Sequence, residues 1–135
     1  MFLVDVNVLS EATKPRPSQL ALDWLDRNRS ELSVNPIILG ELEYGILRLP
    51  VSHNRTKLLD WFTAGLTRLS TWPIDRETGH VWAGLLARLV RKGRAMPVKD
   101  SLIAATALQH QLTVATRNTR DYKHAGVRLV NPFNS

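Results

Sequence analysis

The sequence predicts an α/β protein in which a central, twisted and mostly parallel sheet of about four to five strands carries helices on both faces. Short apolar runs, typical of buried strands, alternate with longer helical patterns along the chain. Strands separated in this way pair in parallel through right-handed crossovers, which place helices on the two faces of the sheet. The chain has 135 residues, so we expect residues 1–135 to form a single domain with one core.

The expected strands are short and rich in apolar, β-branched and aromatic residues. They cover residues 2–5, 32–34, 70–74, 113–116 and 127–130. Pro73 indicates that the third of them lies at an edge of the sheet, because proline has no N–H to donate to a central ladder. The first strand is unusual because a carboxylate, Asp5, ends its apolar run.

The expected helices fill the stretches between these strands. They cover residues 7–13, 19–29, 36–49, 52–69, 76–92 and 97–112. Asn35 and Pro36 are typical of an N-cap and a first helical position, and Gly93 is typical of a helix end. The stretch "KPRPS" at residues 14–18 separates the first two helices.

Composition sets bounds on the partner and on the chemistry. The formal net charge is +6, and 13 of the 18 basic residues are Arg, the side chain that best matches a phosphate group. This balance favours a polyanionic partner, nucleic acid first. The absence of cysteine excludes disulfides, thiolate zinc sites and a cysteine nucleophile. No apolar run has the length of a membrane span and the N-terminus lacks a signal-peptide pattern, so we expect a cytoplasmic protein.

Four acidic residues occupy positions that are unusual for a solvated charge or that follow a strand. They are Asp5 at the end of the first strand, Glu41 on an apolar helix face, Asp100 at the start of a helix and Asp121 in a loop after a strand. In a doubly wound sheet these positions come to one edge. Each also has a structural interpretation: Asp5 as an N-cap, Glu41 paired with Arg48 or with another helix, Asp100 beside a helix dipole and Asp121 in a turn.

Clustered carboxylates repel one another unless a cation neutralises them. Hard divalent ions with oxygen ligands do so, and Mg²⁺ or Mn²⁺ are the natural candidates, whereas the scarcity of His near these positions argues against zinc. A carboxylate-held metal on an Arg-rich protein indicates phosphodiester hydrolysis. Basic residues that precede Asp100 and that surround Asp121 would offset the repulsion between the acids and a nucleic-acid backbone.

Two other functions stay open from the residues alone. The chain could be a non-catalytic RNA-binding or interaction module in which the acids form a structural cluster. An aspartyl phosphotransferase would use Asp5 as its nucleophile, although Asn7 stands where haloacid-dehalogenase-like enzymes have a second Asp. Cleavage of RNA, retention of RNA without cleavage, and a covalent phosphate on Asp5 are the outcomes that separate the three.

Five segments of the chain together resemble one family. They are "FLVDVNVLSE", "ILGELEYGI", "MPVKDSLIAATALQH", "TVATRNTRDY" and "GVRLVNPF". In this order and spacing they are similar to PIN-domain ribonucleases, and more narrowly to the VapC-type toxins of prokaryotic toxin–antitoxin pairs. The resemblance covers nearly the whole chain and implies a three-layer PIN-like nuclease domain and a metal-dependent endoribonuclease.

The resemblance also implies roles for individual residues. It implies that Asp5, Asp100 and Asp121 hold Mg²⁺ or Mn²⁺ directly or through water, and that Glu41 is a further ligand or orients the attacking water. Further polar residues match positions that orient the carboxylates or contact the scissile phosphate. The orienting residues are Asn7 and Thr116, and those beside the phosphate are Arg117 and Asn118.

The partners implied by the resemblance are an RNA substrate, a second copy of the chain and a VapB-type antitoxin. The antitoxin would block the acidic pocket with its C-terminal segment, often through an Arg, and would itself supply the contact with DNA. Two positions depart from the family pattern, because Val6 and Ile38 stand where many members have Thr or Ser. We expect these departures to affect the rate and the metal affinity more than the type of reaction.

Overall fold

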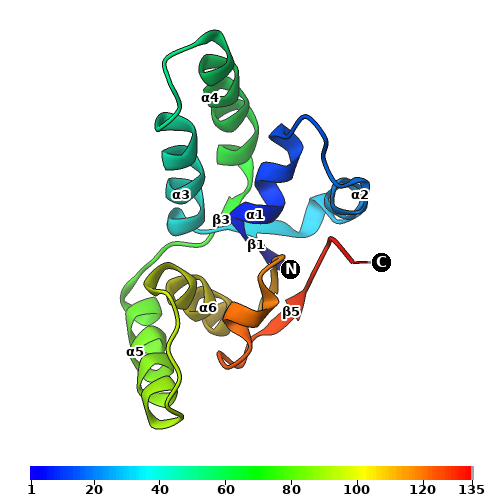
Figure 1. The fold of residues 1–135 in the computed structure, drawn as a ribbon. Helices are drawn as coiled ribbons and strands as arrows, with labels where there is room; N and C mark the ends of the chain where they lie inside the picture. The colour runs from blue at the N-terminus through cyan, green and yellow to red at the C-terminus, as the bar shows by residue number, and fades with distance from the viewer. Residues whose placement is uncertain (135) are drawn as a thin grey trace.

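Five parallel strands form one sheet in the computed structural model, which describes residues 1–134 (Figure 1). The strands are β1 (Phe2–Val4), β2 (Leu32–Val34), β3 (Ser70–Thr71), β4 (Thr113–Ala115) and β5 (Arg128–Val130). The helices are α1 (Val6–Leu9), α2 (Gln19–Arg27), α3 (Pro36–Leu47), α4 (His53–Gly65), α5 (Arg76–Arg91) and α6 (Val98–His110). Four short 3₁₀ helices join them: η1 (Ser10–Thr13), η2 (Arg29–Glu31), η3 (Leu66–Arg68) and η4 (Thr119–Tyr122).

The strand order β3-β2-β1-β4-β5 is doubly wound. The chain moves outward from β1 through β2 to β3, and then crosses to the other side of β1 to add β4 and β5. Helices α3 and α4 lie on one side of the sheet and α5 and α6 on the other, which confirms the predicted α/β class with helices on both faces (Figure 1). The order of the strands reverses between β1 and β4, and in such sheets ligands bind outside the strand carboxyl ends at this point.

The central strands are buried on both faces of the sheet. Leu3 and Val4 are consecutive in β1 and both are fully buried, as are Val34 in β2 and Val114 in β4. Consecutive residues of a strand point to opposite faces, so each layer of helices covers one of them. This is why the strands appear in the sequence as continuous apolar runs rather than as alternating patterns.

Three expected elements end more than two residues away from the observed ones. The strand expected over residues 70–74 has only Ser70–Thr71, because Trp72 donates the last ladder bond to Val34 O at 2.9 Å and Pro73 has no N–H to continue it. The predicted edge position of this strand is confirmed. The helix expected over residues 52–69 ends at Gly65 and continues as η3. The helix expected over residues 7–13 begins as α1 and tightens into η1.

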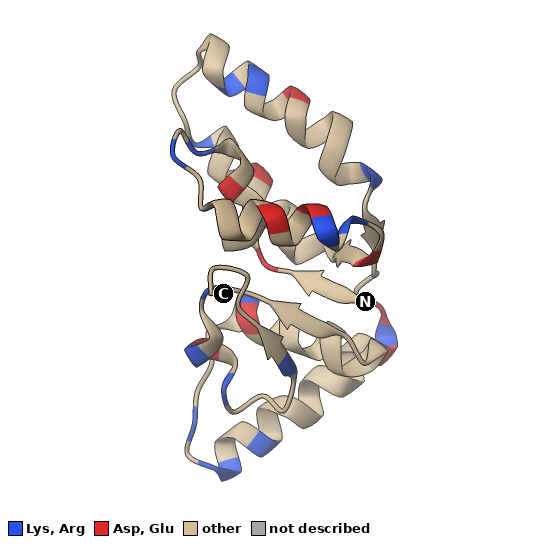
Figure 2. Ribbon diagram, turned by 90° about the vertical axis from the view of Figure 1, so that its right-hand side faces the viewer, with Lys and Arg blue, Asp and Glu red and all other residues tan. Residues whose placement is uncertain are grey.

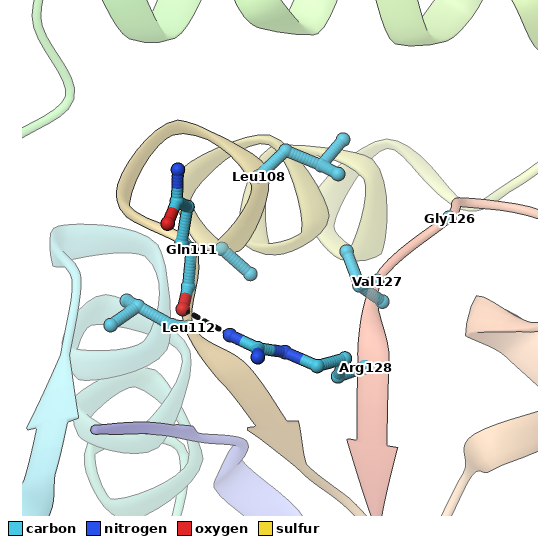
Figure 3. Close-up of a pocket in the computed structure, with 7 residues that line it drawn as sticks. Leu108, Gln111, Leu112, Gly126, Val127 and Arg128 are labelled. Carbon is cyan, nitrogen blue, oxygen red and sulfur yellow. Dashed lines mark hydrogen bonds between the residues drawn. The ribbon is translucent and has the colours of Figure 1, made fainter.

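A pocket of about 280 Å³ lies at the amino ends of β4 and β5 (Figure 3). Gln111 lines it in the left-handed conformation, with φ of 56°, where the chain leaves α6. Arg128 crosses the opening and donates from Nη2 to the Gln111 carbonyl at 2.6 Å. The strands are parallel, so this pocket lies at the opposite edge of the sheet from Asp5. No helix within residues 1–134 is long and apolar enough to span a membrane.

Candidate active site

Asp5 lies at the carboxyl end of β1, where the strand order reverses. Its N–H donates to Ala115 O of β4 at 2.9 Å, which fixes the backbone. The residue as a whole is only 6 % exposed. One carboxylate oxygen, Oδ1, accepts from Val6 N at 2.8 Å and caps α1. Asp5 is therefore the N-cap that the sequence suggested, but the cap uses one oxygen and leaves Oδ2 directed toward β4.

Asn7 and Thr116 lie beside this second oxygen. Thr116 Oγ1 donates to Asp5 Oδ2 at 2.9 Å, and Asn7 Nδ2 lies 3.4 Å from the same oxygen and 3.1 Å from the Thr116 hydroxyl. Asn7 is held in turn by the Arg117 N–H, which donates to Asn7 Oδ1 at 2.9 Å. The Asn118 N–H donates to Thr116 Oγ1 at 3.0 Å. The structure thus brings Asn7 and Thr116 against Asp5 in a connected network that fixes its orientation.

Asp100 faces Asp5 from the first turn of α6. A buried tyrosine, Tyr122 of η4, stands between them: its Oη lies 3.3 Å from Asp5 Oδ2 and 3.5 Å from Asp100 Oδ1. Sequence reasoning missed Tyr122, although it directly follows Asp121 in the segment "TRDY". A large aromatic residue with a hydroxyl in an otherwise polar turn was the available signal, because a buried tyrosine hydroxyl usually has a partner.

The two carboxylates are costly to ionise together. Burial, followed by the charges of Asp5, Asp121 and Glu41, raises the pKa of Asp100 to about 6. Burial also raises the pKa of Asp5, against the opposing hydrogen bonds from Thr116 and Val6. Burial beside both carboxylates raises the pKa of Tyr122 far above its usual range, so its hydroxyl stays protonated and acts as a donor.

Glu41 lies at the rim of this pair. Its Oε1 accepts from Lys99 Nζ at 2.9 Å, which joins α3 to α6. The pairing with another helix is therefore the correct interpretation, and the pairing with Arg48 is wrong. The side chains of Glu41 and Lys99 are 30 % and 61 % exposed, so solvent screens the pair and its net contribution to stability is small.

Asp121, Arg117 and Asn118 lie further out than Thr116. Asp121 is exposed in η4, and its charge contributes to the raised pKa of Asp100. The guanidinium of Arg117 packs over the Phe133 ring, 3.8 Å from its centre, and so is turned toward the C-terminal segment. Asn118 is exposed, with only its backbone N–H bonded into the network around Asp5.

The acids thus form one close pair, Asp5 and Asp100, with Glu41 and Asp121 beside it. Across residues 1–134, no three acidic or histidine side chains converge as a complete ligand set. The pair nevertheless fits a hard divalent cation, because its donors are carboxylate oxygens whose mutual repulsion a cation would relieve. Mg²⁺ commonly takes only one or two protein carboxylates and keeps several waters.

A fifth acid, Glu11, is also buried and was missed. It is 3 % exposed, and its Oε1 accepts from Ser18 N at 2.7 Å while Lys14 Nζ lies 3.0 Å from Oε2. The hydrogen bond from Ser18 is the main reason that its pKa is lowered. Glu11 therefore closes the proline-containing loop at residues 14–18.

Comparison with known proteins gives consistent similarities. The PIN domain family matches residues 2–127. A VapC ribonuclease, Y4jK of Sinorhizobium fredii, is 31 % identical, and the match covers 98 % of this chain and 98 % of that protein. The toxin FitB of Neisseria gonorrhoeae is 31 % identical over 98 % of this chain and 99 % of its own. A chain in the structure of FitAB bound to a DNA fragment superposes with a TM-score of 0.94 at 29 % identity, covering 100 % of this chain and 97 % of that one.

Proposed function

Because the chain belongs to the PIN-domain family, we propose that it is the toxin of a VapBC-type toxin–antitoxin pair and that it cleaves RNA as an endoribonuclease. The observation that carries this proposal is the Asp5–Asp100 carboxylate pair, which lies where the strand order of a doubly wound sheet reverses. Support also comes from relatives named as a VapC ribonuclease and a toxin, each of which matches nearly the whole chain. An enzyme that cuts cellular RNA would act in the cytoplasm.

We assign Asp5 and Asp100 as the residues that hold a divalent cation, Mg²⁺ or Mn²⁺, with Asp121 joining them directly or through water. When bound, such an ion supplies activation of water and stabilisation of the leaving oxygen. Thr116 keeps Asp5 Oδ2 directed into the site, with Asn7 behind it. These residues are proposed as the metal and orienting groups, and their roles rest on geometry and family resemblance.

The groups at the rim are assigned to the water and the substrate. Glu41 would orient the attacking water, for which its carboxylate must share or release the hydrogen bond from Lys99. Arg117 and Asn118 would contact the scissile phosphate. Arg117 must leave the ring of Phe133 to do so, and a phosphate that offers a bidentate contact is the stronger partner for a guanidinium.

We propose two protein partners, a second copy of this chain and a VapB-type antitoxin. Exposed apolar side chains at the end of α3 and just beyond it support a protein contact there, since Tyr44 is 65 %, Leu47 46 % and Val51 88 % exposed. The antitoxin would cover the acids with its C-terminal segment and would itself contact DNA. The superposition on a chain from a DNA-bound FitAB structure supports a complex that contacts DNA.

The test is cleavage of total RNA by the purified chain with Mg²⁺ present. We expect Asp5→Asn and Asp100→Asn each to lower the cleavage rate by about a hundredfold or more, because each removes one charge of the pair. Asp60→Asn, an exposed acid of α4, is the matched control and should cleave like the parent. A chelator should stop cleavage, and Mg²⁺ or Mn²⁺ should restore it. Equal cleavage by the parent and the two site variants would refute the assignment.

A non-catalytic RNA-binding module is the second candidate. The observation that favours it is that the acids of residues 1–134 do not form a complete three-residue ligand set. It predicts RNA retention without cleavage and without any effect of a chelator. The phosphotransferase alternative is weaker, because the PIN domain family matches residues 2–127 and Asn7 stands where haloacid-dehalogenase-like enzymes have a second Asp.

A further inference from the structure

The positive charge of the chain is concentrated in its second half. Residues 76–135 contain ten Lys and Arg against three acids, and two of those acids are Asp100 and Asp121 of the site. Residues 1–75 contain eight basic residues against nine acids. The lower part of the ribbon in Figure 2, which includes α5, is mostly tan, and its charged segments are accordingly blue more often than red.

Several of these cations come together beside the site although they belong to separate segments. Lys92 and Arg94 follow α5, Arg120 lies in η4 and Lys123 directly follows η4, and all four are exposed. We call these four residues the basic face. Within residues 1–134 none of them forms a salt bridge.

The segments of the basic face are held together by Arg88 of α5. Its Nη2 donates to Ala125 O at 3.2 Å, which ties the end of α5 to the chain that follows η4. Three of these cations also act together on His124. Burial, followed by the charges of Arg94, Lys123 and Lys92, lowers the pKa of His124. The cations therefore repel one another in the free protein, and a polyanion would relieve that repulsion.

The basic face is continuous with the acids of the site. Arg120 directly precedes Asp121, and Arg120 and Lys123 line a surface hollow of about 360 Å³ with Thr119 and Leu129. Asp121 directly follows Arg120 and its charge acts on Asp100, so a chain of phosphates that crossed this hollow would run beside the acids of the site. The lining of the hollow includes no Phe, Tyr or Trp, so it offers charge to a backbone rather than stacking platforms to bases.

We infer that Lys92, Arg94, Arg120 and Lys123 bind the phosphates of single-stranded RNA on one side of the scissile bond and lead the strand to the Asp5–Asp100 pair. This inference rests on the proposed function, since it takes RNA as the substrate. It goes further by assigning the substrate path to one surface, whose contacts are with phosphate and are therefore independent of sequence.

Binding is tested without cleavage, on the full chain in the Asp100→Asn background with a chelator present. The probe is a labelled single-stranded RNA of mixed sequence, followed by fluorescence anisotropy over a series of salt concentrations. The test variant combines Arg94→Gln, Arg120→Gln and Lys123→Gln. The control variant combines Arg48→Gln, Lys57→Gln and Arg68→Gln, which removes the same number of Arg and Lys from exposed positions on the α3–α4 side of the sheet.

The test variant should bind the RNA at least about tenfold more weakly at low salt, and the slope of log K against log salt should become shallower by about 2, since each lost phosphate contact of a single strand accounts for about 0.7. The control should keep a slope within about 0.7 of the parent. In the active chain, the same test substitutions should raise KM for RNA and leave kcat within about twofold.

Equal binding by the test and control variants would overturn the inference. So would a loss in the test variant that is confined to duplex DNA or to an acidic antitoxin segment, because the face would then serve another partner. The result is separable from that of the cleavage assay. If the parent cuts RNA and the test variant binds normally, only the substrate path is wrong. If the parent never cuts RNA but the test variant loses binding, the nuclease assignment is wrong and the basic face is still the RNA-binding surface.

Discussion

The hydroxyl of Tyr122 lies 3.3 Å from Asp5 Oδ2, although the two residues are 117 positions apart. The same hydroxyl is 3.5 Å from Asp100 Oδ1, so one protonated donor stands between two carboxylates. Tyr122 is 1 % exposed, which leaves no solvent to replace it. A single O–H can donate to only one carboxylate at a time, so Tyr122 fixes the spacing of the pair without neutralising it.

Tyr122→Phe should therefore lower RNA cleavage by about tenfold, as is usual when a partner of a metal-binding carboxylate is removed. The ring remains, so the fold should be retained. The measurement is the initial cleavage rate at saturating Mg²⁺ together with the melting temperature. Tyr44→Phe, at an exposed position on α3, is the control and should cleave normally. An unchanged rate in Tyr122→Phe would show that the hydroxyl does not position the pair.

The charge of Asp100 should cost stability in the free protein. Its pKa is raised from 3.8 to about 6 in the folded chain. Between pH 3.8 and about pH 6 the folded chain therefore holds this proton more tightly than the unfolded chain, and the stability of the fold decreases as the pH rises. Above about pH 6 the whole cost is present. After solvent screening of this half-buried group we expect about 1 kcal/mol, or about 3 °C in the melting temperature.

Asp100→Asn removes this cost and should raise the melting temperature at about pH 8, but much less at about pH 4, where the parent carboxylate is largely protonated in the folded chain. The measurement is thermal unfolding in chelator at both pH values. Asp60→Asn should show no such difference. If Asp100→Asn raised the melting temperature equally at both pH values, the gain would come from packing and not from the removal of charge repulsion.

The sequence was sufficient for the buried strands. Residues 32–34 match β2, and β1 and β4 each end one residue earlier than expected, because apolar runs that stop at a polar residue mark strands covered on both faces. Asn35 and Ser52 cap α3 and α4 through bonds to Ile38 N and Arg55 N, which are local interactions that a sequence displays directly.

The contacts that build the site were less accessible to sequence reasoning. The four acids could be selected because each looks costly or oddly placed where it stands. Tyr122 carries only the weaker signal of an aromatic hydroxyl in a polar turn, and nothing adjacent to it in the chain predicts its partners, which lie at the end of β1 and in α6. The pair of Lys99 and Glu41 spans 58 residues for the same reason. Such contacts depend on how α6 and η4 pack at the sheet edge.

The positive charge of Lys99 should stabilise the ionised carboxylate of Asp100. Its charge lowers the pKa of Asp100, against the larger effects of burial and of the other acids. Lys99→Gln should therefore raise the pKa of Asp100 above about 6. The measurement is a pH titration of the aspartate side-chain carbons by NMR in chelator, with Lys57→Gln as the control. A pKa that stays the same or falls would show that solvent screens Lys99 from Asp100.

Val6 provides the last prediction, because it stands where many family members have a hydroxyl residue. Its N–H already donates to Asp5 Oδ1 at 2.8 Å, and its side chain lines a mainly apolar hollow with Leu42, Ile46 and Leu58. The hydroxyl that reaches Asp5 comes instead from Thr116, at 2.9 Å. Val6→Thr should therefore change the cleavage rate by less than about threefold, since the orienting bond to Asp5 is already made.

Thr116→Val is the converse substitution, because it removes a hydroxyl where Val6→Thr adds one and keeps a similar side-chain shape. It should lower cleavage by about tenfold or more, because Asp5 loses the hydrogen bond that orients it. It should also cost about 1–3 kcal/mol of stability, because the fully buried Thr116 hydroxyl is the donor to Asp5 and the acceptor for the Asn118 N–H. Cleavage rates and chemical unfolding of both variants decide the matter. If Val6→Thr raised the rate by more than Thr116→Val lowered it, the missing hydroxyl at position 6 would be the limiting feature of the site.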